Sequence, residues 1–174
     1  MKVKENVMES IVNFIVDNFG SNTGGIMREI LVFVISCMPI LELRGGLLAA
    51  SLLGLNPVIS YILCVVGNLL PIPFILWFID YIFEILKKTK MKNIIEKLEN
   101  KADSKKGQIE KYGFLGLVLF VGIPLPGTGA WTGALIASML RMDKKKAFLA
   151  AVLGVFMASI IMMLISFGFL KIFI

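Results

Sequence analysis

An acid and a base stand close together inside an otherwise apolar part of the sequence. Residues 36–54 read SCMPILELRGGLLAASLLG, with Glu42 and Arg44 as the only charged side chains. An ionisable group inside a bilayer costs about 2.5 to 3.5 kcal/mol on insertion scales, so it is functional by default. Burial raises the pKa of a carboxyl group and a nearby cation lowers it, which would let Glu42 load and release a proton. The alternative is structural: a fixed ion pair with Arg44, or a carboxylate that caps a short helix.

A second stretch is related to the first by an offset of 87 residues. Residues 123–141 read IPLPGTGAWTGALIASMLR, and PILELRGGLLAASLLGLN aligns with PGTGAWTGALIASMLRMD. Short apolar segments interrupted by Gly and Pro at matching places in two repeats point to a transporter-type binding site between them. Chance similarity between apolar segments is the alternative. The matched pairs are Pro39 with Pro126, Gly46 with Gly133, Ala50 with Ala137, Ser51 with Ser138, Leu53 with Leu140 and Gly67 with Gly154.

The two turns suggest a site for an anion. Each turn is followed by a short helix, and helix N-termini carry partial positive charge and free N–H donors. The guanidinium of Arg44 adds a fork that fits phosphate bidentately. Three neighbours have simpler alternatives: Thr128 caps its own helix, Trp131 packs, and Asn68 joins helices by a hydrogen bond. The predicted substrate-binding residues are Arg44, Gly45, Gly46, Asn68, Gly127, Thr128, Gly129 and Trp131.

The composition predicts an all-α integral membrane protein with one membrane domain over residues 1–174. Of the 174 residues, 57% are hydrophobic and 17% charged, and the mean hydropathy is +0.86. A soluble domain is about 25% charged. There is no His, and Cys37 and Cys64 lack metal-ligand spacing, so we expect no metal site, no cofactor and no enzyme activity. The Lys-rich segment also contains acids and lacks interleaved aromatics, which argues against a nucleic-acid partner.

The order of segments predicts two similar halves. Residues 1–25 form an amphipathic interfacial helix, 26–86 the first repeat, 87–111 a Lys-rich linker and 112–174 the second repeat. The apolar legs have about 10 to 13 residues, or roughly half a bilayer, so each repeat is predicted to be a re-entrant hairpin plus a transmembrane helix. The predicted helix breaks are Pro39, Pro71, Pro124 and Pro126.

Charge orients the two repeats. Lys and Arg favour the cytoplasmic side of the plasma membrane, so the linker 87–111 is placed there. If the second hairpin enters and leaves on that side, Arg141 and Lys144–Lys146 are cytoplasmic too, and the repeats are inverted. The alternative threads residues 26–54 and 113–141 as full crossings and puts Lys144–Lys146 outside.

Three motifs resemble the small multidrug export protein family, a distant relative of DedA-type membrane proteins. They are PILELRGG at 39–46, GNLLP at 67–71 and PLPGTGAWTGA at 124–134. The family often has a proline soon after the Arg-Gly pair, where this chain has Leu47 and Leu48. The resemblance implies a small transporter with two facing re-entrant hairpins. The DedA-type relatives are associated with movement of lipid phosphates and with proton-motive force.

Together these features predict a proton-coupled secondary transporter or flippase for an amphipathic substrate such as a phosphate-bearing lipid or carrier. Glu42 is the predicted proton site. One alternative is a small multidrug exporter of lipophilic cations, and another is a scaffold that transports nothing. The predicted partners are membrane lipids, the substrate and protons. Gly154 and Ala158 either pack within the chain or form a homodimer contact.

Overall fold

The computed structural model describes residues 10–17, 24–88, 96, 100, 106–125 and 127–169. The regular elements of this described part are helices, which confirms the all-α class; residues 10–17 are helical as well. Most of the predicted interfacial helix, most of the Lys-rich linker and Pro126 lie outside the described residues. The named elements are α2 (Gly25–Cys37), α3 (Glu42–Leu52), α4 (Pro57–Leu69), α5 (Pro71–Lys87), α7 (Lys106–Gly122), α8 (Ala130–Met139), α9 (Lys144–Met163) and the π-helix η2 (Leu164–Phe169).

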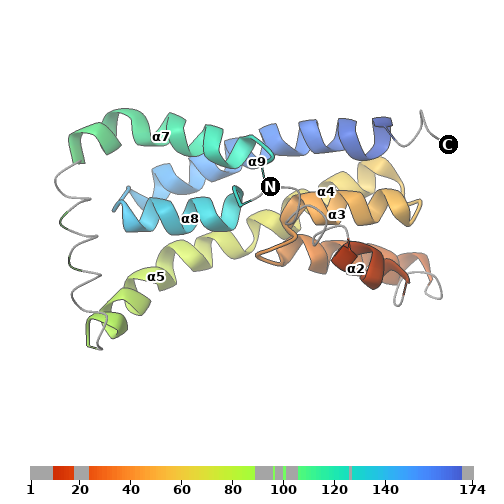
Figure 1. Cartoon of the computed structure of the whole chain (residues 1–174), viewed down its shortest axis with the longest axis horizontal. Coiled ribbons are helices and arrows are strands. Elements are labelled where there is room, and N and C mark those ends of the chain that lie inside the picture. Colours follow the sequence, from red (N-terminus) through yellow and green to blue (C-terminus); the bar gives the residue numbers. More distant parts are fainter. Residues whose placement is uncertain are drawn as a thin grey trace.

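Two helix pairs point toward each other along the long axis of the molecule. The pair α2–α3 occupies one end and α7–α8 the other, and their turns meet near the middle (Figure 1). Consecutive α4 and α5 run along the whole length, and so does α9 with η2. Pro39 lies in the first turn, Pro124 follows α7, and Pro71 is the first residue of α5. These three prolines therefore stand at helix ends, as the sequence predicts.

Helix α7 differs from the prediction in length. It begins at Lys106 and has 17 residues, so the end of the Lys-rich segment is helical and continues into the apolar leg. Lys, Gln and Glu are good helix formers, which explains how a polar sequence extends this leg. The other legs are short: α2 has 13 residues, α3 has 11 and α8 has 10.

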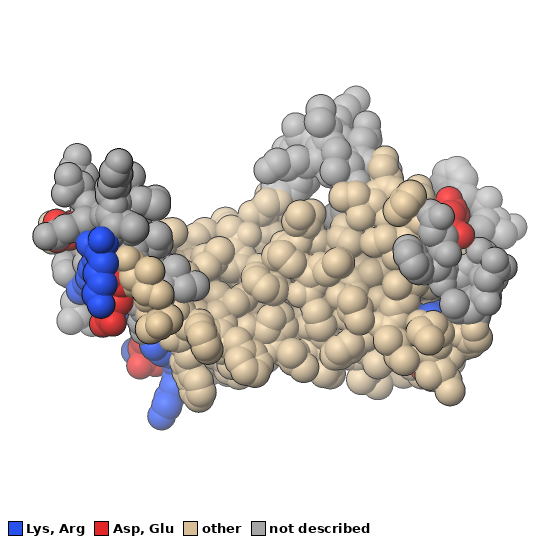
Figure 2. Space-filling model, turned by 90° about the horizontal axis from the view of Figure 1, so that it is seen from below, with Lys and Arg blue, Asp and Glu red and all other residues tan. Residues whose placement is uncertain are grey.

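The outer surface is that of a membrane protein. Pro57–Ile79 and Lys144–Gly168 are helical stretches of 23 and 25 residues, long and apolar enough to cross a bilayer. Large apolar side chains such as Trp77, Phe78 and Leu164 are more than half exposed. On the face in Figure 2, charged residues gather at the two ends, and the broad band between them carries none. An exposed apolar band of this kind is typical of a surface that faces lipid.

The two halves use the same caps, 87 residues apart. The side chain of Asn56 caps α4 by accepting a hydrogen bond from the Val58 amide at 2.9 Å, and Asp143 caps α9 by accepting one from the Lys146 amide at 3.0 Å. Gly54 and Arg141, which follow α3 and α8, have φ of 65° and 50°. This left-handed conformation ends a helix by turning the chain sharply.

Corresponding glycines also allow close helix crossings. A Cβ on Gly67 of α4 would lie 2.8 Å from the Phe33 carbonyl oxygen of α2. A Cβ on Gly154 of α9 would lie 2.9 Å from the Val118 carbonyl oxygen of α7. Gly154 and Ala158 are buried, so they pack within the chain and are not available for a homodimer contact.

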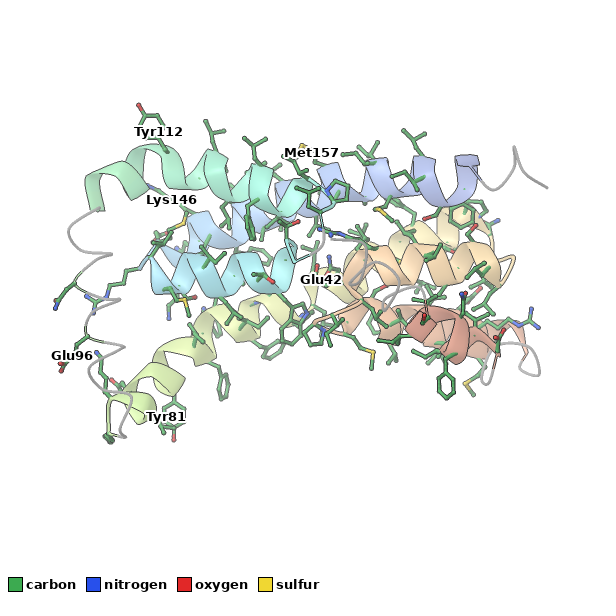
Figure 3. The ribbon with its side chains drawn as sticks, in the orientation of Figure 1. Glu42, Tyr81, Glu96, Tyr112, Lys146 and Met157 are labelled. Carbon is green, nitrogen blue, oxygen red and sulfur yellow. The ribbon has the colours of Figure 1, made fainter. Side chains whose placement is uncertain are left out.

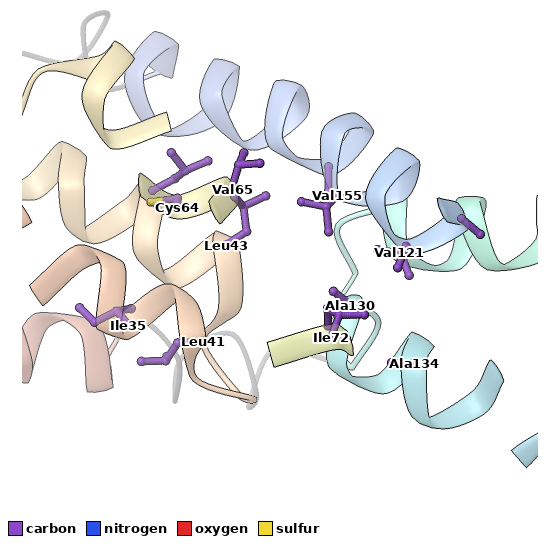
Figure 4. Close-up of a cluster of buried hydrophobic side chains, with 14 of the residues drawn as sticks. Ile35, Leu41, Leu43, Cys64, Val65, Ile72, Val121, Ala130, Ala134 and Val155 are labelled. Carbon is purple, nitrogen blue, oxygen red and sulfur yellow. The ribbon is translucent and has the colours of Figure 1, made fainter. Parts of the chain in front are cut away.

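The interior divides into two regions of different chemistry. We call the first the serine half: α2, α3, α4, the C-terminal part of α9 and η2. It buries Ser36, Ser60, Ser159 and Ser166. The alanine half consists of α5, α7, α8 and the N-terminal part of α9. Its buried side chains in the described residues are apolar. Ile72, Val121 and Ala134 belong to this set and are labelled in Figure 4. The set includes Ala130, Ala134, Ala137, Ala147, Ala150 and Ala151.

Candidate functional site

Glu42 joins the tip of one hairpin to the tip of the other. It is the first residue of α3, only 6% exposed, and lies near the middle of the molecule in Figure 3. Its Oε2 accepts a hydrogen bond from the Ala130 amide and its Oε1 one from the Trp131 amide, each at 3.2 Å. These are the first two N–H groups of α8, whose own N-cap, Gly129, has no side chain to cap them. Glu42 therefore caps a helix of the opposite hairpin.

The backbone at both tips is specialised for this contact. Glu42 has φ of 51°, which is uncommon for a residue with a side chain and costs about 1 to 3 kcal/mol. Gly129 has φ of 150°, and a Cβ there would overlap the carboxylate of Glu42. Only glycine at position 129 leaves room for Glu42 to reach the start of α8.

Arg44 holds the turn of the second hairpin. Its guanidinium donates to the carbonyl oxygen of Leu125, to that of Thr128 at 2.8 Å and to Thr128 Oγ1 at 2.9 Å. The Thr128 hydroxyl also donates to the Ile123 carbonyl at 2.9 Å, so it closes the turn and does not cap α8. No hydrogen bond or ion pair joins Glu42 directly to Arg44. Both charged groups bind the other hairpin instead.

A small cavity lies where the tips meet. Its volume is about 10 Å³, which is room for about one water molecule. Asn68 faces this cavity at 2% exposure, and its Oδ1 has no hydrogen-bond partner in the described part of the chain. The lining residues are Glu42, Leu43, Arg44, Asn68, Val121, Gly129, Ala130, Val155 and Ala158.

The structure places the other predicted site residues differently. Gly45 and Gly46 lie inside α3. Gly45 packs against Leu41, and Gly46 packs against Ser36 and Cys64, so neither glycine lines the cavity. Gly127 is exposed in the second turn with φ of 91°. The backbone amide of Trp131 donates a hydrogen bond to Glu42, while its half-buried side chain packs against the core.

Sequence reasoning missed the partners that complete the site. The carbonyl of Leu125 and the amides of Ala130 and Trp131 are backbone groups, which carry no signal in residue type. It also missed the buried hydroxyls of Ser60 and Ser159, although isolated serines in apolar spans are a readable signal of internal polar contacts.

The fold and the site define a helical integral membrane protein with charged groups buried where two hairpin tips meet. A family model described as "Putative small multi-drug export protein" matches residues 42–161, which is well over half of the chain. The chain belongs to this family, and its description is consistent with a membrane transporter. No curated protein and no solved structure matches the chain.

Proposed function

We propose that the protein is a proton-coupled secondary transporter or flippase for an amphipathic substrate, built from two inverted repeats in the plasma membrane. Each helix pair would be a re-entrant hairpin, with the Lys-rich loop 87–111 in the cytoplasm. The short α2, α3 and α8 support this, because 10 to 13 residues span roughly half of a core about 30 Å thick.

The position of Glu42 supports a two-fold relation between the hairpins. Glu42 and Gly129 stand 87 residues apart, at the offset that aligns the repeats, and they touch each other. A two-fold axis brings equivalent positions into contact where it passes between two copies of a motif. The shared caps and glycine crossings agree with the same relation.

The observation that carries the proposal is the double hydrogen bond from α8 to the Glu42 carboxylate. An ionised carboxylate has two acceptor oxygens, whereas a protonated carboxyl turns one of them into a donor. Protonation would weaken the bond that the protonated oxygen accepts from Ala130 or Trp131, and it would remove the negative charge at the N-terminus of α8. Glu42 would thus hold the two hairpins together while it is ionised, and this contact would loosen when it binds a proton.

Loss of the contact between Glu42 and α8 would leave a site for an anion. The N-terminal amides of α8 would lose their carboxylate, and Arg44 would lose the negative charge nearest to it. A phosphate group could then take the place of Glu42 at these amides and bond to the guanidinium of Arg44. The apolar part of the substrate would stay in lipid, which favours a phosphate-bearing lipid or carrier.

Two other functions have specific support. The family description favours export of lipophilic cations, which would pair with the Glu42 carboxylate. A scaffold that transports nothing is favoured by the hydrogen bonds that Glu42 and Arg44 make within the protein.

The test is transport in proteoliposomes under a pH gradient, with Glu42→Gln compared with Glu84→Gln. Glu84 is an exposed acid on α5, so its variant removes the same charge away from the site. A fluorescent long-chain alkyl phosphate serves as the anionic probe, and ethidium as the cationic probe. We expect the wild type and Glu84→Gln to move the alkyl phosphate faster under the gradient, and Glu42→Gln to lose this acceleration.

Other outcomes separate the alternatives. Gradient-driven alkyl phosphate movement in Glu42→Gln at the wild-type rate would show that the proton role is wrong. Movement of ethidium alone would favour the multidrug exporter. The scaffold predicts no movement of either probe, a less stable Glu42→Gln variant, and restored stability when Arg44 is neutralised as well.

A further inference from the structure

Asn68, in the last turn of α4, carries a buried polar atom that the surrounding helices leave unsatisfied. Its side chain is 2% exposed, and its Oδ1 has no hydrogen-bond partner in the described part of the chain. Lipid and apolar side chains cannot donate to this oxygen, and buried polar groups are normally hydrogen-bonded. We therefore expect Asn68 to bind a donor that does not belong to the described residues.

The cavity between the hairpin tips offers room for such a donor beside Asn68. Its volume of about 10 Å³ suits one water molecule. Asn68, Glu42 and Arg44 all line it, and all three side chains are buried. The other lining residues are apolar or glycine. A molecule in the cavity therefore has these three polar side chains, together with the backbone, as its bonding partners.

Glu42 and Arg44 keep bonding capacity beyond their contacts with the second hairpin. Each carboxylate oxygen of Glu42 accepts one backbone hydrogen bond and has a further lone pair. The guanidinium of Arg44 has more N–H groups than its three bonds to Leu125 and Thr128 use. The cavity is thus bordered by two acceptors, the Glu42 carboxylate and Asn68 Oδ1, and by one donor, Arg44.

This set of groups selects a neutral occupant while Glu42 is ionised. A metal cation would meet the positive charge of Arg44, and an anion would meet the carboxylate of Glu42 and the oxygen of Asn68. Like charges repel strongly in a low-dielectric interior. A water molecule has two O–H donors and two lone pairs, so it can donate to Glu42 and Asn68 and accept from Arg44.

We propose that Asn68 holds one water molecule in this cavity, and that the water accepts the hydrogen bond of Glu42 when Glu42 carries a proton. The second part rests on the proposed proton role of Glu42. When an O–H bond forms on Glu42, the water rotates, accepts this O–H and continues to donate to Asn68. The amides of Ala130 and Trp131 are donors, so they cannot accept it. Asn68 is thus a positioning residue for the protonated state.

The water site is tested by crystal structures from a lipid phase, at a resolution that shows ordered water. We expect density for one water molecule within hydrogen-bond distance of Asn68 and Glu42 in the wild type. Asn68→Leu keeps about the same size but removes the acceptor, and should lose this density. An empty cavity in the wild type would overturn the proposal, and so would a water that stays in place in Asn68→Leu.

The bond from protonated Glu42 is tested by infrared difference spectra between high and low pH, with the protein in lipid bilayers. The C=O band of protonated Glu42 is the band that Glu42→Gln lacks. It should move to higher frequency in Asn68→Leu, because the carboxyl group loses its hydrogen bond. Tyr61→Phe is the matched control. It removes a hydroxyl that bonds to Ser159 at the α4–α9 interface, outside the cavity lining, and should keep the wild-type band.

The two measurements separate this inference from the proposed function. A Glu42 band that does not move in Asn68→Leu overturns the role of Asn68, although Glu42 still binds a proton. A wild-type spectrum without any Glu42-dependent carboxyl band overturns the proton role of Glu42, and the second part of the inference with it. If Asn68→Leu does not fold, the wild type decides. Its bound-water band, identified by its shift in heavy-oxygen water, must change when Glu42 is protonated, and an unchanged band overturns the inference.

Discussion

The serine half and the alanine half share a framework and differ in their chemistry. Both have a helix pair, a capped long helix and a glycine where that helix crosses the first leg of the pair. The serine half buries hydroxyls and supplies Glu42 and Arg44, whereas the alanine half buries apolar side chains and supplies backbone groups that bind these charges. The comparison teaches that helix caps and glycine crossings recur 87 residues apart, whereas the charged side chains at the tips come from one half.

There is a physical reason for this asymmetry at the tips. Positions 87 residues apart face each other there, as Glu42 and Gly129 do. Two glutamates or two arginines would place like charges together in a low-dielectric interior, where their repulsion is strong. A carboxylate opposite a glycine and a helix N-terminus avoids the repulsion and caps the helix.

The largest expected difference between the halves concerns Arg44 and Trp131, which stand 87 residues apart. Arg44→Met leaves the Leu125 and Thr128 carbonyls unpaired and Glu42 without a nearby cation, so we expect unfolding in detergent to become easier by about 3 to 5 kcal/mol. Trp131→Phe removes an indole N–H that has no partner among the described residues, and should cost only about 1 kcal/mol. Equal losses would contradict the asymmetry of the tips.

The shared framework predicts similar losses at Gly67 and Gly154. Alanine at either position pushes a Cβ against a backbone carbonyl of the first leg, so each variant should lose about 1 to 3 kcal/mol of unfolding free energy. Gly116→Ala in α7 meets nothing within 4 Å and should instead stabilise the protein by about 0.5 to 1 kcal/mol. A large loss at only one crossing would show that the halves do not pack alike.

The smallest effects are expected at the helix caps. Asn56→Ala and Asp143→Ala each remove a side-chain acceptor from the first turn of a long helix, at a cost of about 1 kcal/mol. Thermal denaturation in the same detergent measures both. A shift in melting temperature for one variant and none for the other would argue that the two caps are not equivalent.

Much of the framework could be predicted from residue types. Pro39, Pro71 and Pro124 stand at helix ends because proline cannot continue a helix hydrogen-bond ladder. The start of α7 at Lys106 could not be read from the sequence, since the polar residues there favour both a loop and a helix. Family membership was also readable from the motifs and is confirmed by the match over residues 42–161.

The site was predicted only in part. Glu42, Arg44, Thr128 and Gly129 do come together, but Thr128 does not cap α8, and Gly45 and Gly46 serve helix packing. The error has one source: a pattern of residue types does not show which hairpin a side chain serves. Capping by Glu42 was considered, and the structure assigns that cap to the opposite hairpin.

By itself the sequence determined the helical membrane class, three short legs (α2, α3 and α8) and the presence of an acid and a base among apolar residues. Hydropathy, proline and glycine act locally, so they can be read along the chain. Only the tertiary structure decided that Glu42 and Arg44 bind the backbone of the second hairpin, more than 80 residues away. Backbone amides and carbonyls are identical at every position, and packing alone determines which of them a buried charge meets.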